Sequence, residues 1–324
     1  MTADIHEQLT KYLTDAHSIE EQALAQLRTA PDLAGDPEIA AAFREHLRET
    51  ETHEQITREL LEARDAAPSK LKDTVMAVGG KGFLLFARLQ PDTPGKLAAH
   101  ALSYEGLETA SYELLMRIAE RAGEVDVAEA AQRIRDEERE MIRRLEANFD
   151  RSVEASLREV GPADLQEQLR KYLADAHAIE EQAIALLERA PGMSDDAPQL
   201  ARTYADHLDE TREHAEMIAE RLNELGGDPS SLKDAALRLG ALNWGAFFQG
   251  HPDTPGKLAA FAYAFEHLEI GAYEQLRRVA ARAGDQPTVV IVERILAEER
   301  SAAEKLAGLF DEAAVSSLAA QGIA

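Results

Sequence analysis

Two stretches of similar sequence decide the fold of this chain: HLRETETH at residues 46–53 and HLDETREH at residues 207–214. Residues three and four apart lie on one face of an α-helix, so His46, Glu49 and His53 form one stripe of potential metal ligands. The same spacing is continued in both directions by the apolar residues Ile39, Ala42, Ile56 and Leu60. Polar side chains therefore occupy a face that the pattern predicts to be buried. A metal ion is the commonest compensation for such a cluster of histidine and carboxylate.

The composition of the 324-residue chain favours a soluble helical protein. Hydrophobic residues make up 45% of the sequence and aromatic residues only 5%, whereas strands would need more β-branched and aromatic residues. The formal net charge of -25 repels nucleic-acid phosphates and anionic membrane surfaces, so we expect neither as a partner. Cysteine is absent from the sequence, which excludes disulfides and thiolate ligands.

The sequence gives no sign of targeting. Its first residues lack the basic and then apolar pattern of a signal peptide. No apolar run approaches the ~20 residues that a membrane helix needs. We therefore expect a cytoplasmic protein.

The chain is a tandem repeat. KYLTDAHSIEEQA at residues 11–23 returns as KYLADAHAIEEQA at residues 171–183, and PDTPGKLAA at residues 91–99 returns unchanged at residues 252–260. The offset stays close to 160 residues throughout, which indicates a duplicated domain and excludes a short-period solenoid.

Breaker residues divide each half into four long helices. Gly161 and Pro162 separate the halves, so the expected domains are residues 1–160 and 161–324. In the first half the first expected helix covers residues 4–28 and the second ends near residue 66. The third and fourth cover residues 93–122 and 125–157. A less regular segment lies between the second and third helices. The fold class is therefore all-α, with two tandem four-helix bundles that each contain a crossover.

Each long helix places an acid near the middle of its apolar stripe, so in a bundle these acids meet in one layer. Carboxylates packed together would repel and take up protons, and two divalent cations would remove that repulsion. We therefore predict a two-metal site in each half. The predicted metal ligands are Glu20, Glu49, His53, Glu105, Glu108 and Glu138, and in the second half Glu180, Glu210, His214, Glu266, Glu269 and Glu299.

These motifs resemble a known group of proteins. An acid in the first helix, an acid and a histidine in the second, a crossover, and acids in the third and fourth resemble the ferritin-like di-metal carboxylate bundles. More narrowly, DAHSIEEQ, HLRETETHEQ, HLDETREHAE, FEHLEIGAYEQL and the late DEER and AEER resemble the YciE/YciF family of ferritin-like stress proteins (DUF892). The resemblance covers both halves. It implies a ferritin-like fold with up to two iron or manganese ions per repeat.

The sequence departs from that group in its nitrogen donors. Ferritin-like oxidases carry Glu-x-x-His on the second and fourth helices, but Thr52 follows Glu49 at this spacing and Met141 follows Glu138. The fourth helix therefore lacks a nitrogen ligand. The histidines whose role stays open between ligand and structural residue are His17, His46, His177 and His207. Tyr112 and Tyr273 are either hydrogen-bond donors to a ligand carboxylate or core tyrosines.

Three functions fit these features. The first is a di-iron or di-manganese oxidoreductase, catalase-like or ferroxidase-like, that reacts with peroxide or dioxygen in a stress response. The second is metal binding without turnover. The third is a structural bundle whose buried acids are protonated or paired with arginine. The duplication further suggests that the two halves pack as an intramolecular pseudo-dimer.

Overall fold

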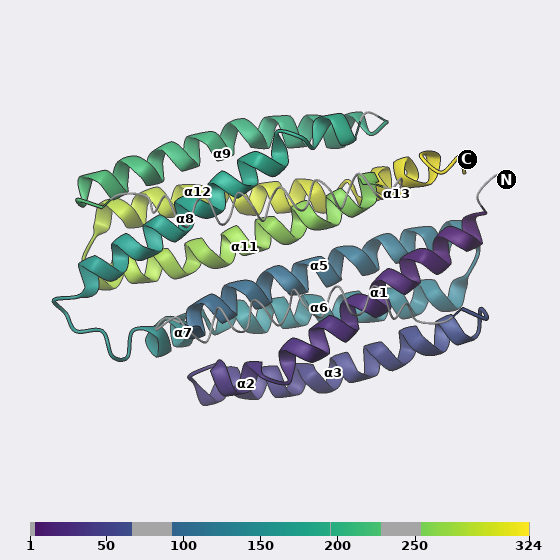
Figure 1. Ribbon diagram of the computed structural model, residues 1–324, viewed down its shortest axis with the longest axis horizontal. Coiled ribbons are helices and arrows are strands. Elements are labelled where there is room, and N and C mark those ends of the chain that lie inside the picture. The colour runs from purple at the N-terminus through teal and green to yellow at the C-terminus, as the bar shows by residue number, and fades with distance from the viewer. Residues whose placement is uncertain (1–3, 67–92, 195, 228–253, 324) are drawn as a thin grey trace. The chain divides into compact units, whose positions relative to one another are not determined.

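The computed structural model describes residues 4–66, 93–194, 196–227 and 254–323. All regular secondary structure in these ranges is helical (Figure 1). The chain forms two compact units, one of residues 1–158 with 321–324 and the other of residues 159–320. None of the described helices is both long and apolar enough to span a membrane.

The first unit is a four-helix bundle. Its helices are α1 (Ile5–Leu27), α2 (Ala30–Leu33), α3 (Pro37–Glu62), α5 (Thr93–Ala122), α6 (Val125–Ala147) and α7 (Phe149–Ser156). Helices α1 and α6 each contact both α3 and α5, so the four long helices enclose one core (Figure 1). Most of the predicted crossover between α3 and α5 lies outside the described residues. The predicted all-α bundle is confirmed.

The second unit repeats this plan. Its helices are α8 (Leu165–Leu187), η1 (Pro191–Met193), α9 (Pro198–Glu224), α11 (Thr254–Arg282), α12 (Gln286–Ala307) and α13 (Phe310–Ala319). Helix α8 contacts α9 and α11, and α12 contacts the same two helices. The long connection from α9 to α11 again lies mostly outside the described residues.

Local sequence sets where the helices begin and end. Asp36 accepts hydrogen bonds from the backbone N–H groups of Glu38 (2.9 Å) and Ile39 (3.3 Å), and Pro37 fills the first position of α3. Gly123 follows the end of α5 with φ of 73°. This left-handed conformation is easily reached only by glycine, and it allows the sharp reversal into α6.

The fourth helix is broken, whereas the sequence predicted one helix over residues 125–157. At Asn148 the backbone leaves helical geometry (φ -106°, ψ 7°), and its side-chain amide donates to the carbonyl of Arg144 at 2.7 Å. After the break the chain continues as α7, which packs on α5. Phe149 and Val153 of α7 are fully buried. Leu309, between α12 and α13, makes the corresponding break in the second unit.

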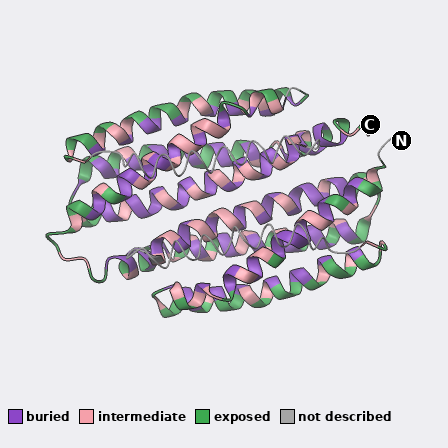
Figure 2. Cartoon of the chain, viewed as in Figure 1, coloured by how far each residue is buried: buried purple, intermediate pink, exposed green. Residues whose placement is uncertain are grey.

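Buried residues form stripes along the long helices (Figure 2). The predicted stripe of α1 is buried at Leu9, Leu13, Ala16, Glu20, Ala23 and Leu27. The predicted stripe of α6 is buried at Val127, Ala131, Ile134, Glu138, Met141 and Leu145. These two helices therefore turn their predicted acid toward the core.

The buried stripe of α3 lies further round the helix than the sequence predicted. The residues buried along this helix include Ile39, Phe43, His46, Thr50, His53, Thr57 and Leu61. The residues expected between the two histidines and beyond them are only half-buried, namely Ala42, Glu49, Ile56 and Leu60. Glu49 therefore flanks the buried stripe and does not face the middle of the core.

Candidate metal centre

The core of the first unit holds a compact cluster of acids and imidazoles. Its members are Glu20 from α1, His46 and His53 from α3, Glu105 and Glu108 from α5, and Glu138 from α6. All six are buried. They form two overlapping groups in which the potential ligand atoms lie within 4.8 Å of one another: His46, Glu105, Glu108 and Glu138, and Glu20, His53 and Glu138. Glu138 belongs to both groups.

Glu138 lies between the two imidazoles. Its Oε1 is 2.8 Å from Nδ1 of His53, and its Oε2 is 3.4 Å from Nε2 of His46. The histidines are two helical turns apart, so each approaches the same carboxylate from a different end. One carboxylate with an oxygen toward each imidazole is suited to bridge two cations.

The outer nitrogen of each imidazole is held by a carboxylate. Nδ1 of His46 lies 3.0 Å from Glu49 Oε2, and Nε2 of His53 lies 2.7 Å from Glu137 Oε2. An ionised carboxylate only accepts hydrogen bonds, so these outer nitrogens carry the proton. The inner nitrogens, Nε2 of His46 and Nδ1 of His53, therefore face the cluster. Such outer-shell pairing is what metal-ligating histidines commonly show.

The cluster contains buried polar atoms that have no hydrogen-bond partner. In the first unit Glu20 Oε2 and both carboxylate oxygens of Glu108 have no partner among the described residues. The inner imidazole nitrogens contact other members of the cluster, His46 Nε2 with Glu105 Oε2 at 3.0 Å and His53 Nδ1 with Glu138 Oε1 at 2.8 Å. Leaving even one such group unpaired costs about 1–3 kcal/mol. Divalent cations would satisfy all of them together, so the donor set fits a metal centre.

Burial and neighbouring charges shift the pKa values of the metal-free cluster toward the protonated forms. Burial, with a smaller contribution from the Glu138 carboxylate, raises the pKa of Glu20 to about 8 against the opposing effect of His53. Burial and the surrounding carboxylates also raise the pKa of Glu108 well above its usual value. Burial alone would lower the pKa of His53, but its hydrogen bonds to Glu137 and Glu138 raise it to about 10. Bound cations would displace these protons.

The second unit reproduces the cluster. The two groups there are His207, Glu266, Glu269 and Glu299, and Glu180, His214 and Glu299. Glu299 Oε1 is 2.8 Å from His214 Nδ1, and its Oε2 is 3.4 Å from His207 Nε2. Both oxygens of Glu269 again have no partner among the described residues. Burial raises the pKa of Glu180 to about 8.

A tyrosine orients one carboxylate in each unit. The Tyr112 hydroxyl donates a hydrogen bond to Glu20 Oε1, and the Tyr273 hydroxyl donates to Glu180 Oε1. Both tyrosines are fully buried. Of the two roles considered for them, the structure shows hydrogen bonding to a clustered carboxylate.

The structure places the predicted ligands unequally. It brings together Glu20, His53, Glu105, Glu108, Glu138, Glu180, His214, Glu266, Glu269 and Glu299. It does not bring Glu49 or Glu210 into either cluster, because the rotation of α3 and α9 leaves both at the edge of the core. Their carboxylates hold the outer nitrogens of His46 (3.0 Å) and His207 (3.1 Å).

His46 and His207 take the cluster positions that the sequence analysis gave to Glu49 and Glu210. His17 and His177 are not members of these clusters. The second imidazole of each cluster comes from α3 or α9. The repetition of both histidines at the same spacing in the two halves is the sequence signal that could have indicated this arrangement, although the role of His46 and His207 was left open.

The outer support of the clusters, meaning the residues that hold the outer imidazole nitrogens and their neighbours, differs between the units. In the first unit Arg144 donates to both oxygens of Glu49, at 2.9 and 3.0 Å. In the second unit Lys305 is the cation beside Glu210, with its Nζ 3.8 Å from Oε1. A guanidinium holds a carboxylate in a fixed two-point geometry that an ammonium does not impose. Glu49 is therefore fixed more firmly than Glu210.

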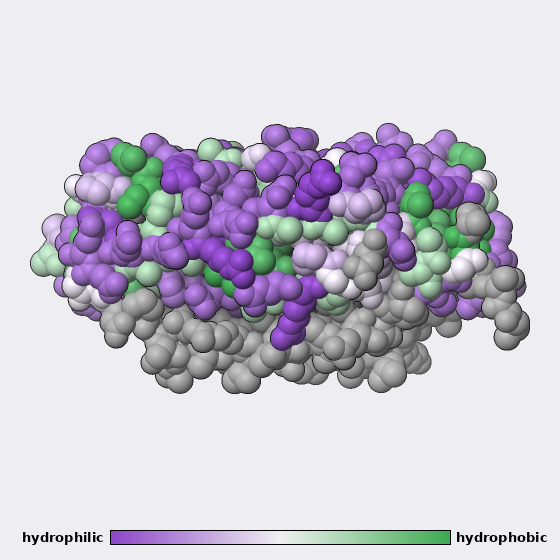
Figure 3. Space-filling model, turned by 90° about the horizontal axis from the view of Figure 1, so that it is seen from above, coloured by the Kyte–Doolittle hydropathy of each residue, from purple (hydrophilic) through white to green (hydrophobic). Residues whose placement is uncertain are grey.

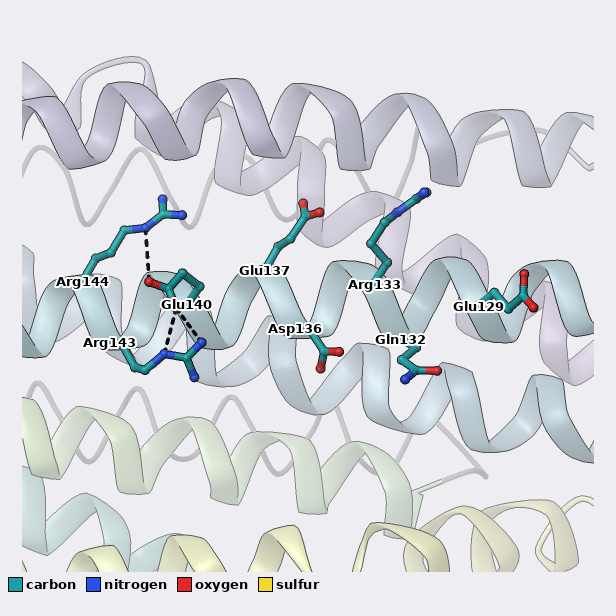
Figure 4. A pocket seen from close by; sticks show the side chains of 8 residues that line it. All are labelled: Glu129, Gln132, Arg133, Asp136, Glu137, Glu140, Arg143 and Arg144. Carbon is teal, nitrogen blue, oxygen red and sulfur yellow. Dashed lines mark hydrogen bonds and ion pairs between the residues drawn. The ribbon is translucent and has the colours of Figure 1, made fainter.

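The described surface is mainly hydrophilic in the view of Figure 3, in keeping with the high net charge. An open hollow along α6 is lined by Glu129, Gln132, Arg133, Asp136, Glu137, Glu140, Arg143 and Arg144 (Figure 4). Glu137 and Arg144 rise from the same side of α6 in this view. These are the residues that contact His53 and Glu49, so the hollow exposes outer support of the cluster but none of its six members.

Part of the chain is similar in sequence to a known bacterioferritin. Over 94 residues, or 29% of the chain, the sequence is 33% identical to a protein named Bacterioferritin from Desulfovibrio desulfuricans (strain ATCC 27774 / DSM 6949 / MB). The match covers 45% of that protein, so the chain spans less than half the length of this curated relative. No solved structure gives a significant match to the chain.

The sequence pattern of one family matches the chain twice. It is described as "Domain of unknown function (DUF892)", and the matches cover residues 4–158 and 164–319. Together they include nearly the whole chain and one match falls on each helical bundle. The chain therefore belongs to the DUF892 family, of which it carries two copies in tandem, and it is related to the ferritin-like proteins.

Proposed function

We propose that each unit binds two iron or manganese ions and that the chain is a ferritin-like redox protein that reacts with peroxide or dioxygen. The observation that carries the proposal is the position of Glu138, with one oxygen toward His46 and the other toward His53. Glu299 has the same position between His207 and His214. A carboxylate in this position would contact an ion held by either histidine.

The ligands divide into two sets. In the first unit His46, Glu105 and Glu108 would hold one ion, Glu20 and His53 would hold the other, and Glu138 would contact both. Sets of carboxylate oxygen with one imidazole favour iron and manganese over softer metals. The similarity to a bacterioferritin supports iron as one of the two choices. The bound ions would supply the electrons that reduce one molecule of peroxide or dioxygen, and in peroxide turnover a second peroxide, oxidised to dioxygen, would return them.

The protein's own groups prepare the site for this chemistry. Burial of all six side chains excludes bulk water from the cluster. Glu49 and Glu137 keep the outer imidazole nitrogens protonated, so the inner nitrogens are directed at the ions. The Tyr112 hydroxyl keeps its proton at Glu20 and fixes that carboxylate. Burial and the nearby acids raise the pKa of Tyr112 well above its usual value.

Turnover of hydrogen peroxide tests the redox proposal. The metal-free protein is loaded with Mn²⁺, or with Fe²⁺ under anaerobic conditions, and peroxide loss and dioxygen release are followed. We expect metal-dependent peroxide loss that disappears in the Glu138→Gln/Glu299→Gln variant. Two ions bound per unit without turnover of peroxide or reaction with dioxygen would replace this proposal with metal binding alone.

The outer support gives a second test. Glu49→Gln is expected to weaken metal binding in the first unit about 10–100-fold without lowering the number of ions bound at saturation, because Glu49 acts through His46. Calorimetric titration with Mn²⁺ measures both quantities. Glu210→Gln is the matched variant, and its effect should be smaller because Lys305 fixes Glu210 less firmly. If Glu49→Gln lowers the saturating number of ions, Glu49 is itself a ligand.

A further inference from the structure

The first unit contains a second group of potential metal ligands outside the buried cluster. It consists of His17 and Glu21 from α1 and Glu54 from α3, whose potential ligand atoms lie within 4.8 Å of one another. His17 and Glu54 are buried, whereas Glu21 is exposed. The group therefore has two ligands anchored in the protein and one that faces solvent.

Among the described residues, the cationic groups near the Glu54 carboxylate make long contacts with it. His17 Nδ1 lies 3.9 Å from Glu54 Oε1, and the half-exposed Arg58 lies 3.7 Å from Oε2. Both distances exceed those of a charge-assisted hydrogen bond. His17 Nδ1 is also 3.2 Å from the Thr57 hydroxyl. In the part of the chain that the structure describes, no cation makes a close ion pair with the Glu54 carboxylate, whose side chain is 12% exposed.

The second unit shows that the fold does not require this polar group. The repeat keeps His177 and Glu181 at the positions of His17 and Glu21, but Ala215 replaces Glu54 and Ile218 replaces Thr57. Both replacements are buried in α9. An otherwise equivalent bundle therefore packs apolar side chains where the first unit buries a carboxylate and a hydroxyl.

We propose that His17, Glu21 and Glu54 form a mononuclear divalent-cation site that is present in the first unit alone. One imidazole and two carboxylates are a donor set for Zn²⁺, Fe²⁺ or Mn²⁺. The exposed Glu21 side chain is free to turn toward the two buried ligands, which closes the set around one ion. The bound cation supplies the positive charge that Glu54 lacks. This site does not depend on redox chemistry at the dinuclear centres.

Zn²⁺ is a suitable probe because imidazole and carboxylate sites bind it tightly. Crystals of the full chain soaked in Zn²⁺ should show an anomalous-scattering peak in contact with His17 and Glu54, and no matching peak beside His177. In Glu54→Ala, which copies the second unit, this peak should vanish and calorimetric titration should show one fewer Zn²⁺ per chain. The peaks beside Glu138 and Glu299 should remain.

Two further variants make the test specific. Arg58→Ala removes the arginine near Glu54 but keeps the ligands, so the peak should remain. His17→Gln should remove the peak as Glu54→Ala does. The proposal is overturned if the wild type shows no peak at this position or if Glu54→Ala leaves it in place. It is equally overturned if Glu54→Ala removes the peaks beside Glu138, because these residues would then only support the dinuclear centre.

Discussion

Glu138→Gln is expected to abolish binding of both ions in the first unit, and Glu138→Gln/Glu299→Gln should bind no metal in either cluster. Glutamine keeps the size of the side chain but replaces one carboxylate oxygen with an amide nitrogen, which does not ligate a cation. Because Glu138 contacts both groups of ligands, its loss affects both ions at once. The loss of affinity should exceed the ~10–100-fold that removal of an outer partner produces.

Metal analysis by plasma mass spectrometry after equilibration with Mn²⁺ measures this result. Glu137→Gln is the matched control, because Glu137 precedes Glu138 on α6 and contacts the outer nitrogen of His53. It should weaken binding and retain both ions at saturation. An unchanged thermal transition of the metal-free variants would show that they still fold. If the first unit of Glu138→Gln still binds two ions, Glu138 does not have the proposed role of contacting both.

Removing metal should lower the thermal stability of the chain strongly. A ligand that binds only the folded state stabilises it by about 2.7 kcal/mol when its free concentration is 100 times Kd. For a domain of this size, that corresponds to a rise in Tm of about 5–10 °C. We therefore expect Mn²⁺ to raise the Tm of the metal-free protein by about this amount, and a chelator to reverse the change.

Calorimetric melting with Mn²⁺ and with chelator tests this expectation. The Glu138→Gln/Glu299→Gln variant is the control, and most of the rise in Tm should be lost in it. The same Tm with metal and with chelator in the wild type would favour the structural alternative. The buried acids would then be neutralised by protons, as the raised pKa values of Glu20 and Glu108 in the metal-free cluster allow.

Most of the fold follows from periodicity and repetition in the sequence. Helices α1 and α6 each have one apolar stripe that contains one acid. Burying the stripe therefore also buries Glu20 in α1 and Glu138 in α6. The exact repetition of the pattern in the second half made a chance arrangement improbable. For these reasons the all-α bundles, and the layer of acids within them, were predictable.

The orientation of α3 was not predictable to the same degree. Ile39, His46 and His53 are seven residues apart, so a three-four stripe through them can take its other members from either side. In the structure Phe43 is buried on that stripe, and Ala42 is only half-buried. Burying the larger side chain removes more apolar surface from water. This choice turns Thr50 inward and leaves Glu49 at the edge.

Other features depend on contacts that spacing does not encode. The protonated nitrogen of His53 is set by Glu137, which lies on another helix. The break at Asn148 depends on the packing of Phe149 against α5. These features depend on tertiary contacts. Helical periodicity alone would continue α6 past Asn148.

The most direct test of the dinuclear centre is anomalous diffraction at the manganese absorption edge from crystals of the full chain grown with Mn²⁺. We expect two peaks in each unit, one on each side of the carboxylate of Glu138 and one on each side of that of Glu299. A single peak in each unit, or none beside these two carboxylates, would contradict the account.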